Sequence, residues 1–177
     1  MKLLFILLMS CNTAVFAQDS LYSITVSNSS GKFIPLSYYK GKKIIISSVS
    51  TDNLKKKNGI NYWDSLQKAN PNTRIILMPA GDIGTTVDTT SVLSLQKQSG
   101  QNIMISDVAP SKKDKGAKQN RLLQWLTHSS QNHHFDGDVE TDGQLYVISE
   151  SGVLYAVLSN AVNQNTINDV LKQADVK

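Results

Sequence analysis

Runs of β-branched residues alternate with stretches of helical spacing through the middle of this chain, and this alternation constrains the fold most. Three such runs, residues 44–49, 74–79 and 102–105, are expected to form buried strands. Between them, apolar side chains recur at helical spacing over residues 59–69 and 88–98. Strands that alternate with helices form a parallel sheet covered by helices on both faces. We therefore predict a three-layer α/β fold.

Both ends of the chain add antiparallel strands to this pattern. Short alternating runs separated by turn residues predict one hairpin near the N-terminus and another near the C-terminus. The four strands expected there are residues 21–26, 32–36, 144–148 and 153–158. Helices are expected over residues 120–127 and 164–174, and the lysine-rich residues 109–120 are expected to form a mobile loop. The central sheet is therefore predicted to be mixed.

The first 17 residues have the pattern of a secretory signal peptide. Lys2 supplies a positive charge, residues 3–9 are an unbroken apolar run, and Ala17 completes a small-residue cleavage site. The apolar run is far shorter than the roughly 20 residues that span a bilayer. We expect cleavage after Ala17 and an exported protein, periplasmic or extracellular, with one domain over residues 18–177.

The single cysteine of the sequence, Cys11, lies inside this segment. A second interpretation makes Cys11 a lipid attachment site that anchors the protein to a membrane through acyl chains. Cleavage removes the thiol and lipidation blocks it, so both interpretations leave the domain without a free cysteine. The domain then has no disulfide, no thiolate nucleophile and no cysteine metal ligand.

The charge of the chain gives little indication of its partner. The formal net charge is +4, and the basic residues are not concentrated into the stripe that contacts a phosphate backbone. We expect no nucleic-acid partner and no transmembrane span. The expected partner is an unidentified protein or small molecule.

Four segments, in their order and spacing, carry a resemblance to a known family. They are residues 36–42, 75–79, 122–127 and 145–158. Together they resemble the glutathione peroxidase family of the thioredoxin-like superfamily. The resemblance implies a central mixed β-sheet flanked by helices on both faces, with an extra N-terminal β-hairpin. It also implies a site built from a cysteine or selenocysteine, a glutamine and a Trp-Asn pair.

None of these four functional residues is present at the corresponding positions. Alignment on the shared segments places the nucleophile at Asn53, the glutamine at Asp82 and the Trp-Asn pair at Thr141 and Asp142. Cleavage of a peroxide O–O bond by this family requires a thiolate or selenolate. We therefore expect an exported protein that has lost thiol peroxidase activity, needs no cofactor, and serves as a binding or structural module. Asn53 itself is expected to be a helix N-cap or turn residue.

Two alternative functions remain open. All three histidines lie close together in residues 128–142, where acidic residues are also frequent, and such residues bind zinc, copper or nickel. The candidate ligands are His128, His133, His134 and Asp136. The other alternative is an enzyme with a new, non-thiol chemistry in a pocket formed around Asn53, Asp82 and Asp142.

Overall fold

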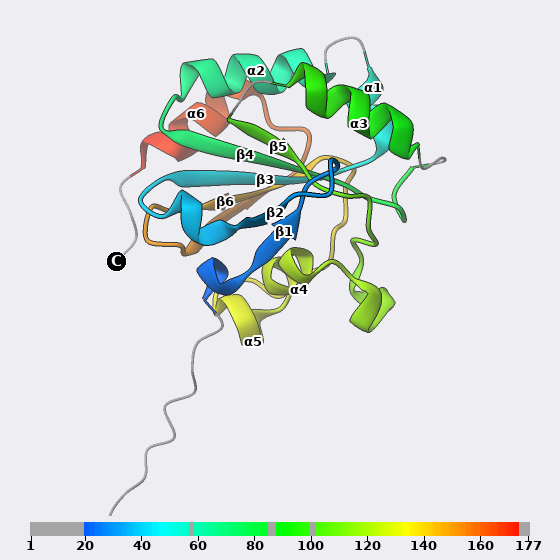
Figure 1. Cartoon of the computed structure of the whole chain (residues 1–177). Helices are drawn as coiled ribbons and strands as arrows, with labels where there is room; N and C mark the ends of the chain where they lie inside the picture. The colour runs from blue at the N-terminus through cyan, green and yellow to red at the C-terminus, as the bar shows by residue number, and fades with distance from the viewer. Residues whose placement is uncertain (1–19, 57–58, 85–87, 100–101, 174–177) are drawn as a thin grey trace, which may run out of the picture.

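The computed structural model describes residues 20–56, 59–84, 88–99 and 102–173 (Figure 1). The predicted signal peptide and the Cys11 anchor lie outside these residues. The strands are β1 (Thr25–Ser27), β2 (Phe33–Pro35), β3 (Lys43–Val49), β4 (Thr73–Pro79), β5 (Ile103–Ile105), β6 (Gln144–Ile148) and β7 (Leu154–Leu158). The α-helices are α1 (Thr51–Lys55), α2 (Gly59–Ala69), α3 (Thr89–Gln98), α4 (Arg121–Thr127), α5 (Ser129–Asn132) and α6 (Gln164–Lys172). Three 3-10 helices, η1 (Leu21–Ser23), η2 (Leu36–Tyr39) and η3 (Lys113–Lys118), complete the described elements.

Five strands form one mixed sheet in the order β5-β4-β3-β6-β7. The pairs β3–β4 and β4–β5 are parallel, and the pairs β3–β6 and β6–β7 are antiparallel. In the central register, Ile45 lies between Ile75 of β4 and Val147 of β6. The β-branched run thus occupies the middle strand, buried on both faces, and the prediction of a mixed central sheet is confirmed.

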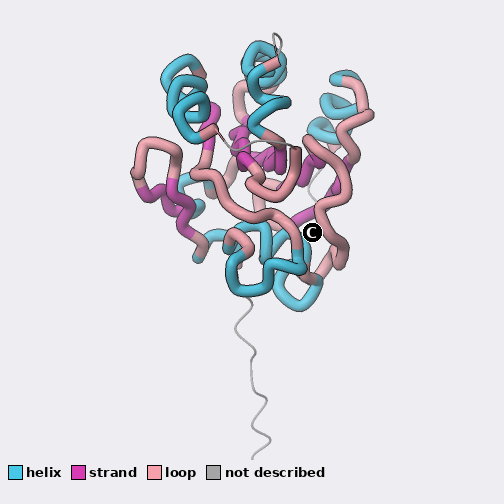
Figure 2. The backbone as a smooth tube through the Cα atoms, turned by 90° about the vertical axis from the view of Figure 1, so that its right-hand side faces the viewer, coloured by secondary structure: helices cyan, strands magenta, loops and turns pink. Residues whose placement is uncertain are grey.

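Successive side chains of β3 point to opposite faces of the sheet and divide the core in two. Ile44 and Ile46 pack with α4 and the N-terminal hairpin on one face, whereas Ile45 packs with α2, α3 and α6 on the other. Figure 1 shows α2, α3 and α6 on one side of the sheet, with α4, α5, β1 and β2 on the opposite side. Figure 2 shows strands between two groups of helices from a second direction. The predicted three layers are therefore present.

The predicted N-terminal hairpin forms and also contacts one edge of the main sheet. β1 pairs with β2 through Val26 and Ile34. Beyond β1, the chain bridges to the end of β5: the Ser29 amide donates to the Ile105 carbonyl (2.9 Å), and the Asp107 amide donates to the Ser27 carbonyl (3.1 Å). The chain after β1 thus joins the C-terminal end of β5, the edge strand of the main sheet, through an isolated bridge at Asn28 and Ser106.

Two local predictions are wrong. The predicted strand 21–26 begins as the 3-10 helix η1, so only its second half is extended. The lysine-rich segment 109–120 is an anchored turn containing η3, because acidic side chains from distant segments accept bonds from its backbone. The amide of Lys113 donates to Asp138 Oδ1 (3.0 Å), and the amide of Ser111 donates to Asp82 Oδ1 (2.8 Å).

None of the helices in the described ranges is long and apolar enough to cross a membrane.

Candidate functional site

A serine–aspartate pair fixes the loop that faces the C-terminal end of β3. Ser50 follows the strand directly and is 1% exposed. Asp142 Oδ1 accepts a hydrogen bond from the Ser50 amide (2.7 Å), and Asp142 Oδ2 accepts one from the Ser50 hydroxyl (2.6 Å). The same hydroxyl oxygen accepts from the Asn53 amide (3.1 Å), so Ser50 is the N-cap of α1. The expectation that Asn53 caps the helix is therefore wrong: Asn53 lies three residues inside it.

Two further contacts hold the backbone around Asp142. The Gly143 amide donates to the Ser48 carbonyl (2.8 Å), and the Asn160 side-chain amide donates to the Asp142 carbonyl (2.8 Å). Gly143 has φ +91°, which favours glycine, and a Cβ there would lie in tight contact with the Asn160 Cβ at 3.3 Å. The loop before β6 is thus fastened to β3 on one side and to the segment after β7 on the other.

A pocket of about 340 Å³ opens beside these contacts. Its lining consists of an apolar wall with amide side chains and one lysine. The residues are Val49, Asn53, Leu54, Lys56, Gly59, Tyr62, Trp63, Gly143, Leu145, Asn160, Val162, Asn163 and Gln164. The rings of Tyr62 and Trp63 meet edge to face with centroids 5.1 Å apart. Burial raises the pKa of Tyr62 above its ordinary value, so its hydroxyl remains a hydrogen-bond donor at neutral pH.

The Asn53 carboxamide stands at the wall of this pocket, at the position that the resemblance assigns to the nucleophile. Within the described ranges its side chain makes no hydrogen bond, so the amide nitrogen and the carbonyl oxygen are both available to a ligand. An amide nitrogen is not nucleophilic at neutral pH. No cysteine, histidine, aspartate or glutamate is among the described residues that line the pocket. The arrangement can hold a molecule, and its described lining offers amide, ammonium and phenol groups in place of a thiol, an imidazole or a carboxylate.

Asp82, the position that the resemblance assigns to the glutamine, bonds to the lysine-rich segment and not to the pocket. Its carboxylate accepts hydrogen bonds from the Ser111 amide and hydroxyl and from the Lys112 amide (2.7–2.9 Å). Burial alone would raise the pKa of Asp82, but these hydrogen bonds outweigh it and lower the pKa below its ordinary value. Asp82 does not line the pocket. It anchors the lysine-rich segment.

The other two family positions meet Asn53 at the same end of the sheet. Asp142 is bonded to Ser50, as described above. The hydroxyl of Thr141, next to it, is buried and has no hydrogen-bond partner in the part of the chain that the structure covers. The structure thus places Asn53, Thr141 and Asp142 around the end of β3 and engages Asp82 elsewhere.

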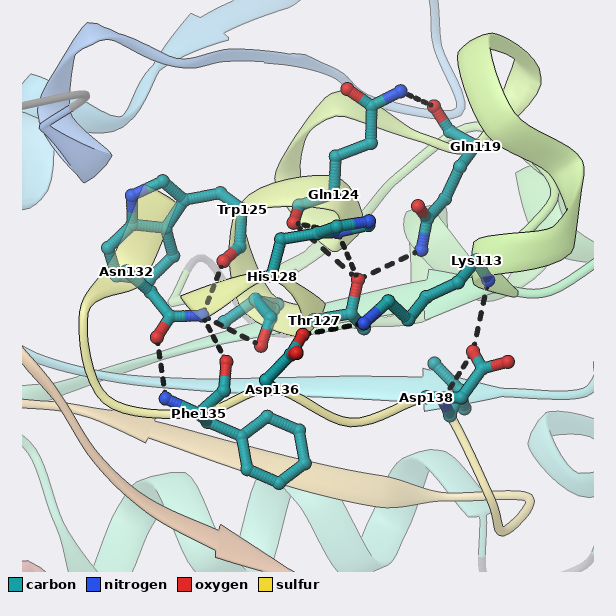
Figure 3. A network of polar contacts seen from close by, with 12 residues as sticks. Lys113, Gln119, Gln124, Trp125, Thr127, His128, Asn132, Phe135, Asp136 and Asp138 are labelled. Atoms are coloured by element: carbon teal, nitrogen blue, oxygen red, sulfur yellow. Dashed lines mark hydrogen bonds and ion pairs between the residues drawn. The ribbon is translucent and has the colours of Figure 1, made fainter. Parts of the chain in front are cut away.

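The histidine-containing segment is organised around a buried asparagine (Figure 3). Asn132 is 3% exposed and uses both ends of its amide. Its nitrogen donates to the carbonyls of Trp125 (2.8 Å), Leu126 (3.3 Å) and Phe135 (2.9 Å). Its oxygen accepts from the amides of His134 (2.8 Å) and Phe135 (2.7 Å). These bonds fold the segment back on α4.

The four candidate metal ligands are not brought together by this arrangement. Nδ1 of His128 donates to the Gln124 carbonyl (2.9 Å), and Asp136 pairs with the Lys113 ammonium (2.6 Å). His133 and His134 are exposed, and His133 ends α5 with φ +62°. Across the described ranges, no three histidine, cysteine, aspartate or glutamate side chains are placed to share a metal ion.

Ser50, Lys56 and Asn160 belong to the site but are not among the site residues predicted from the sequence. Ser50 could have been found, because a serine before Thr51 and Asp52 is a typical helix start. No local signal marks Asn160, because it reaches the pocket only through the folding of distant segments. Lys56 belongs to a run of three lysines that could indicate anion binding, and it lies three residues after Asn53 in the same pocket wall.

Comparison with known proteins finds similarity at the level of structure. No protein-family model matches the chain, and no curated protein sequence matches it. Among solved structures, the glutathione peroxidase GPX1 of T. cruzi is 16% identical with a TM-score of 0.63, over 86% of this chain and 94% of that one. The exposed lipoprotein thioredoxin Etrx1 of Streptococcus pneumoniae is 17% identical with a TM-score of 0.55, over 84% and 97%. A thioredoxin-family thiol:disulfide interchange protein from Chlorobium tepidum is 17% identical with a TM-score of 0.56, over 88% and 94%. These similarities establish a thioredoxin-like fold, as the resemblance implied.

Proposed function

We propose that this chain is an exported binding protein that uses the thioredoxin-like fold without thiol chemistry. The observation that carries the proposal is the pocket beside Asn53. It lies where the resemblance places the reactive atom, and its wall presents a free carboxamide in place of a thiol.

The composition of the chain supports the loss of peroxidase activity. In the glutathione peroxidase family, reduction of a peroxide begins when a thiolate or selenolate attacks one of the peroxide oxygens. The only cysteine is Cys11, and residues 12–177 contain none. Among the described residues at the end of β3, no other side chain can donate the electron pair that cleaves the peroxide O–O bond.

The shape of the pocket supports a binding role. Small-molecule sites are concave, mostly apolar and equipped with a few polar groups that orient the ligand, with volumes of roughly 300–1,000 Å³. The pocket of about 340 Å³ is lined by aliphatic and aromatic side chains together with several amides. Its polar neighbours Ser50 and Asp142 are bonded to each other, which keeps the pocket preformed.

Export rests on the N-terminal sequence. Residues 1–17 match a signal peptide, and some structural neighbours are an exposed lipoprotein and a secreted oxidoreductase. Expression in a bacterial host with mass spectrometry of the envelope fraction tests this part. We expect a chain that begins at Gln18, and an unprocessed cytoplasmic chain would contradict it.

A peroxidase assay tests the central claim. Purified protein is mixed with hydrogen peroxide or an organic hydroperoxide, and with glutathione or a thioredoxin system as reductant. We expect consumption of peroxide at the rate of the buffer control. Turnover above that control, retained after Cys11 is removed by processing or by Cys11→Ser, would refute the loss of activity.

A further inference from the structure

We infer that the pocket beside Asn53 takes a small organic anion: an apolar body of aromatic size with one carboxylate or similar group at its end. This inference rests on the proposed binding function and adds the charge and shape of the ligand. It is carried by the distribution of charge, hydrogen-bond donors and apolar surface in the pocket lining.

The charge in the described lining of the pocket is positive. Lys56 is the only charged residue among the described residues that line the pocket, and it forms no ion pair within them. Its neighbour Lys55 differs, because its ammonium pairs with Asp88 at 2.7 Å. The carboxylate of Asp142, next to the lining residue Gly143, has both oxygens bonded to Ser50. No acid within the described lining therefore neutralises Lys56, and an anionic ligand can.

Unused hydrogen-bond donors accompany this lysine. The Asn163 side-chain oxygen accepts from the Thr166 amide (3.0 Å) at the start of α6, which leaves its NH₂ group without a partner in the described part of the chain. The Asn53 NH₂ group is also unused there. Two NH₂ groups and one ammonium thus stand at the same pocket, and a carboxylate has the lone pairs to accept from all three.

The remaining lining is apolar and suits the body of the ligand. Its members are the aliphatic side chains of Val49, Leu54, Leu145 and Val162 and the rings of Tyr62 and Trp63. Burial of an apolar body against these groups provides affinity at about 25 cal/mol per Å². The donors then fix the orientation of the body and favour an anion over a neutral or cationic group of the same shape.

Three probes with the same body and different charge test the inference: 2-naphthylacetate, 2-naphthylacetamide and 2-naphthylethylamine. Binding is measured by calorimetry, with ¹H–¹⁵N NMR of the Trp63 indole to locate the site. We expect the acetate to bind about five- to tenfold more tightly than the acetamide, since a charge-assisted hydrogen bond exceeds a neutral one by about that factor. The amine should bind most weakly.

Paired lysine variants assign the preference. Lys56→Gln should lower the affinity for the acetate to that for the acetamide, and Lys55→Gln, outside the lining, should leave it unchanged. Both lysines are exposed, so neither substitution threatens the fold. Val162→Trp fills the pocket and should abolish binding of the acetate.

The outcomes separate the two proposals. Equal affinity for all three probes at Trp63 overturns the anion inference and leaves the binding function standing. A preference for the acetate that survives Lys56→Gln overturns the assignment of that preference to Lys56. No binding by any probe, with no shift of the Trp63 indole signal, overturns the inference and removes the pocket as support for the binding function.

Discussion

Removing the Ser50–Asp142 contact should destabilise the protein in a way that shows the two side chains act together. Ser50→Ala deletes the N-cap of α1 and the hydroxyl that donates to Asp142. An N-cap is worth about 1 kcal/mol. A hydrogen bond to a charged group is worth about 1.5 kcal/mol at the low end of its range, the end that suits the half-buried Asp142. We therefore expect Ser50→Ala to lower the free energy of unfolding by about 2.5 kcal/mol.

Asp142→Ala should have a similar effect for a different reason. It leaves the buried Ser50 amide and hydroxyl without their acceptor, which costs about 2–3 kcal/mol. The double variant loses the shared hydroxyl–carboxylate bond only once. The two effects should therefore fall short of additivity by about 1.5 kcal/mol.

Urea unfolding followed by tryptophan fluorescence measures these quantities, because Trp63 and Trp125 are buried at 7% and 3% exposure, one on each face of the sheet. Asp114→Ala is the matched control. Asp114 is exposed, and its ion pair with Lys115 should contribute under about 0.5 kcal/mol. Single-variant effects that add within about 0.3 kcal/mol would show that the serine and the aspartate do not stabilise each other.

Two further substitutions test structural roles described above. Asp82→Asn should lower the free energy of unfolding by about 2 kcal/mol at pH 7. Since the folded pKa of Asp82 lies below its unfolded value near 3.9, this difference should persist from pH 7 to about 5 and shrink as the pH falls below about 4. Urea titrations at several pH values measure it, and a difference that grows toward low pH would contradict the sign. Asn132→Ala should cost about 3 kcal/mol, because it leaves buried carbonyls and amides unpaired. Its control is Asn61→Ala on the exposed face of α2, expected within about 0.5 kcal/mol. Similar thermal midpoints for the two alanine variants would exclude Asn132 as the organiser of its segment.

The central sheet could be predicted from the sequence because its signals are local. The run Ile44–Ile45–Ile46 has the continuous apolar character of a strand covered on both faces, and all three side chains are fully buried. Gln164 to Lys172 has its apolar residues on one helical face, and Ile167 and Leu171 are the ones buried. Such patterns depend on neighbours a few residues away.

The contacts that were missed join residues far apart in the chain. Lysines 112, 113, 115 and 118 indicate a mobile segment when read alone. Bonds to Asp82 and Asp138, at sequence separations of 25–30, hold that segment in place. Helix α1 was missed because five residues are too short to show a period.

The site was predicted in part. Alignment on the resemblance brought Asn53 and Asp142 to one end of the sheet, where the structure also places them. It did not indicate that Asp142 bonds to Ser50 or that Asp82 is engaged with Ser111, because both pairings depend on side-chain direction rather than on position along the sheet. The places of Asn53 and Asp142 at the end of the sheet could therefore be predicted, whereas the hydrogen bonds of Asp142 and Asp82 could not.

The bridge between the N-terminal hairpin and β5 limits how far the chain can be shortened. A fragment that began after β2 would lose the partners of Ile105 and Asp107 and would leave the C-terminal end of β5, at the edge of the sheet, without those bonds. Unprotected strands of this kind are templates for self-association. A shortened chain that keeps the edge of β5 protected should therefore retain β1 and the turn that follows it, even though the pocket lies on the other side of the sheet.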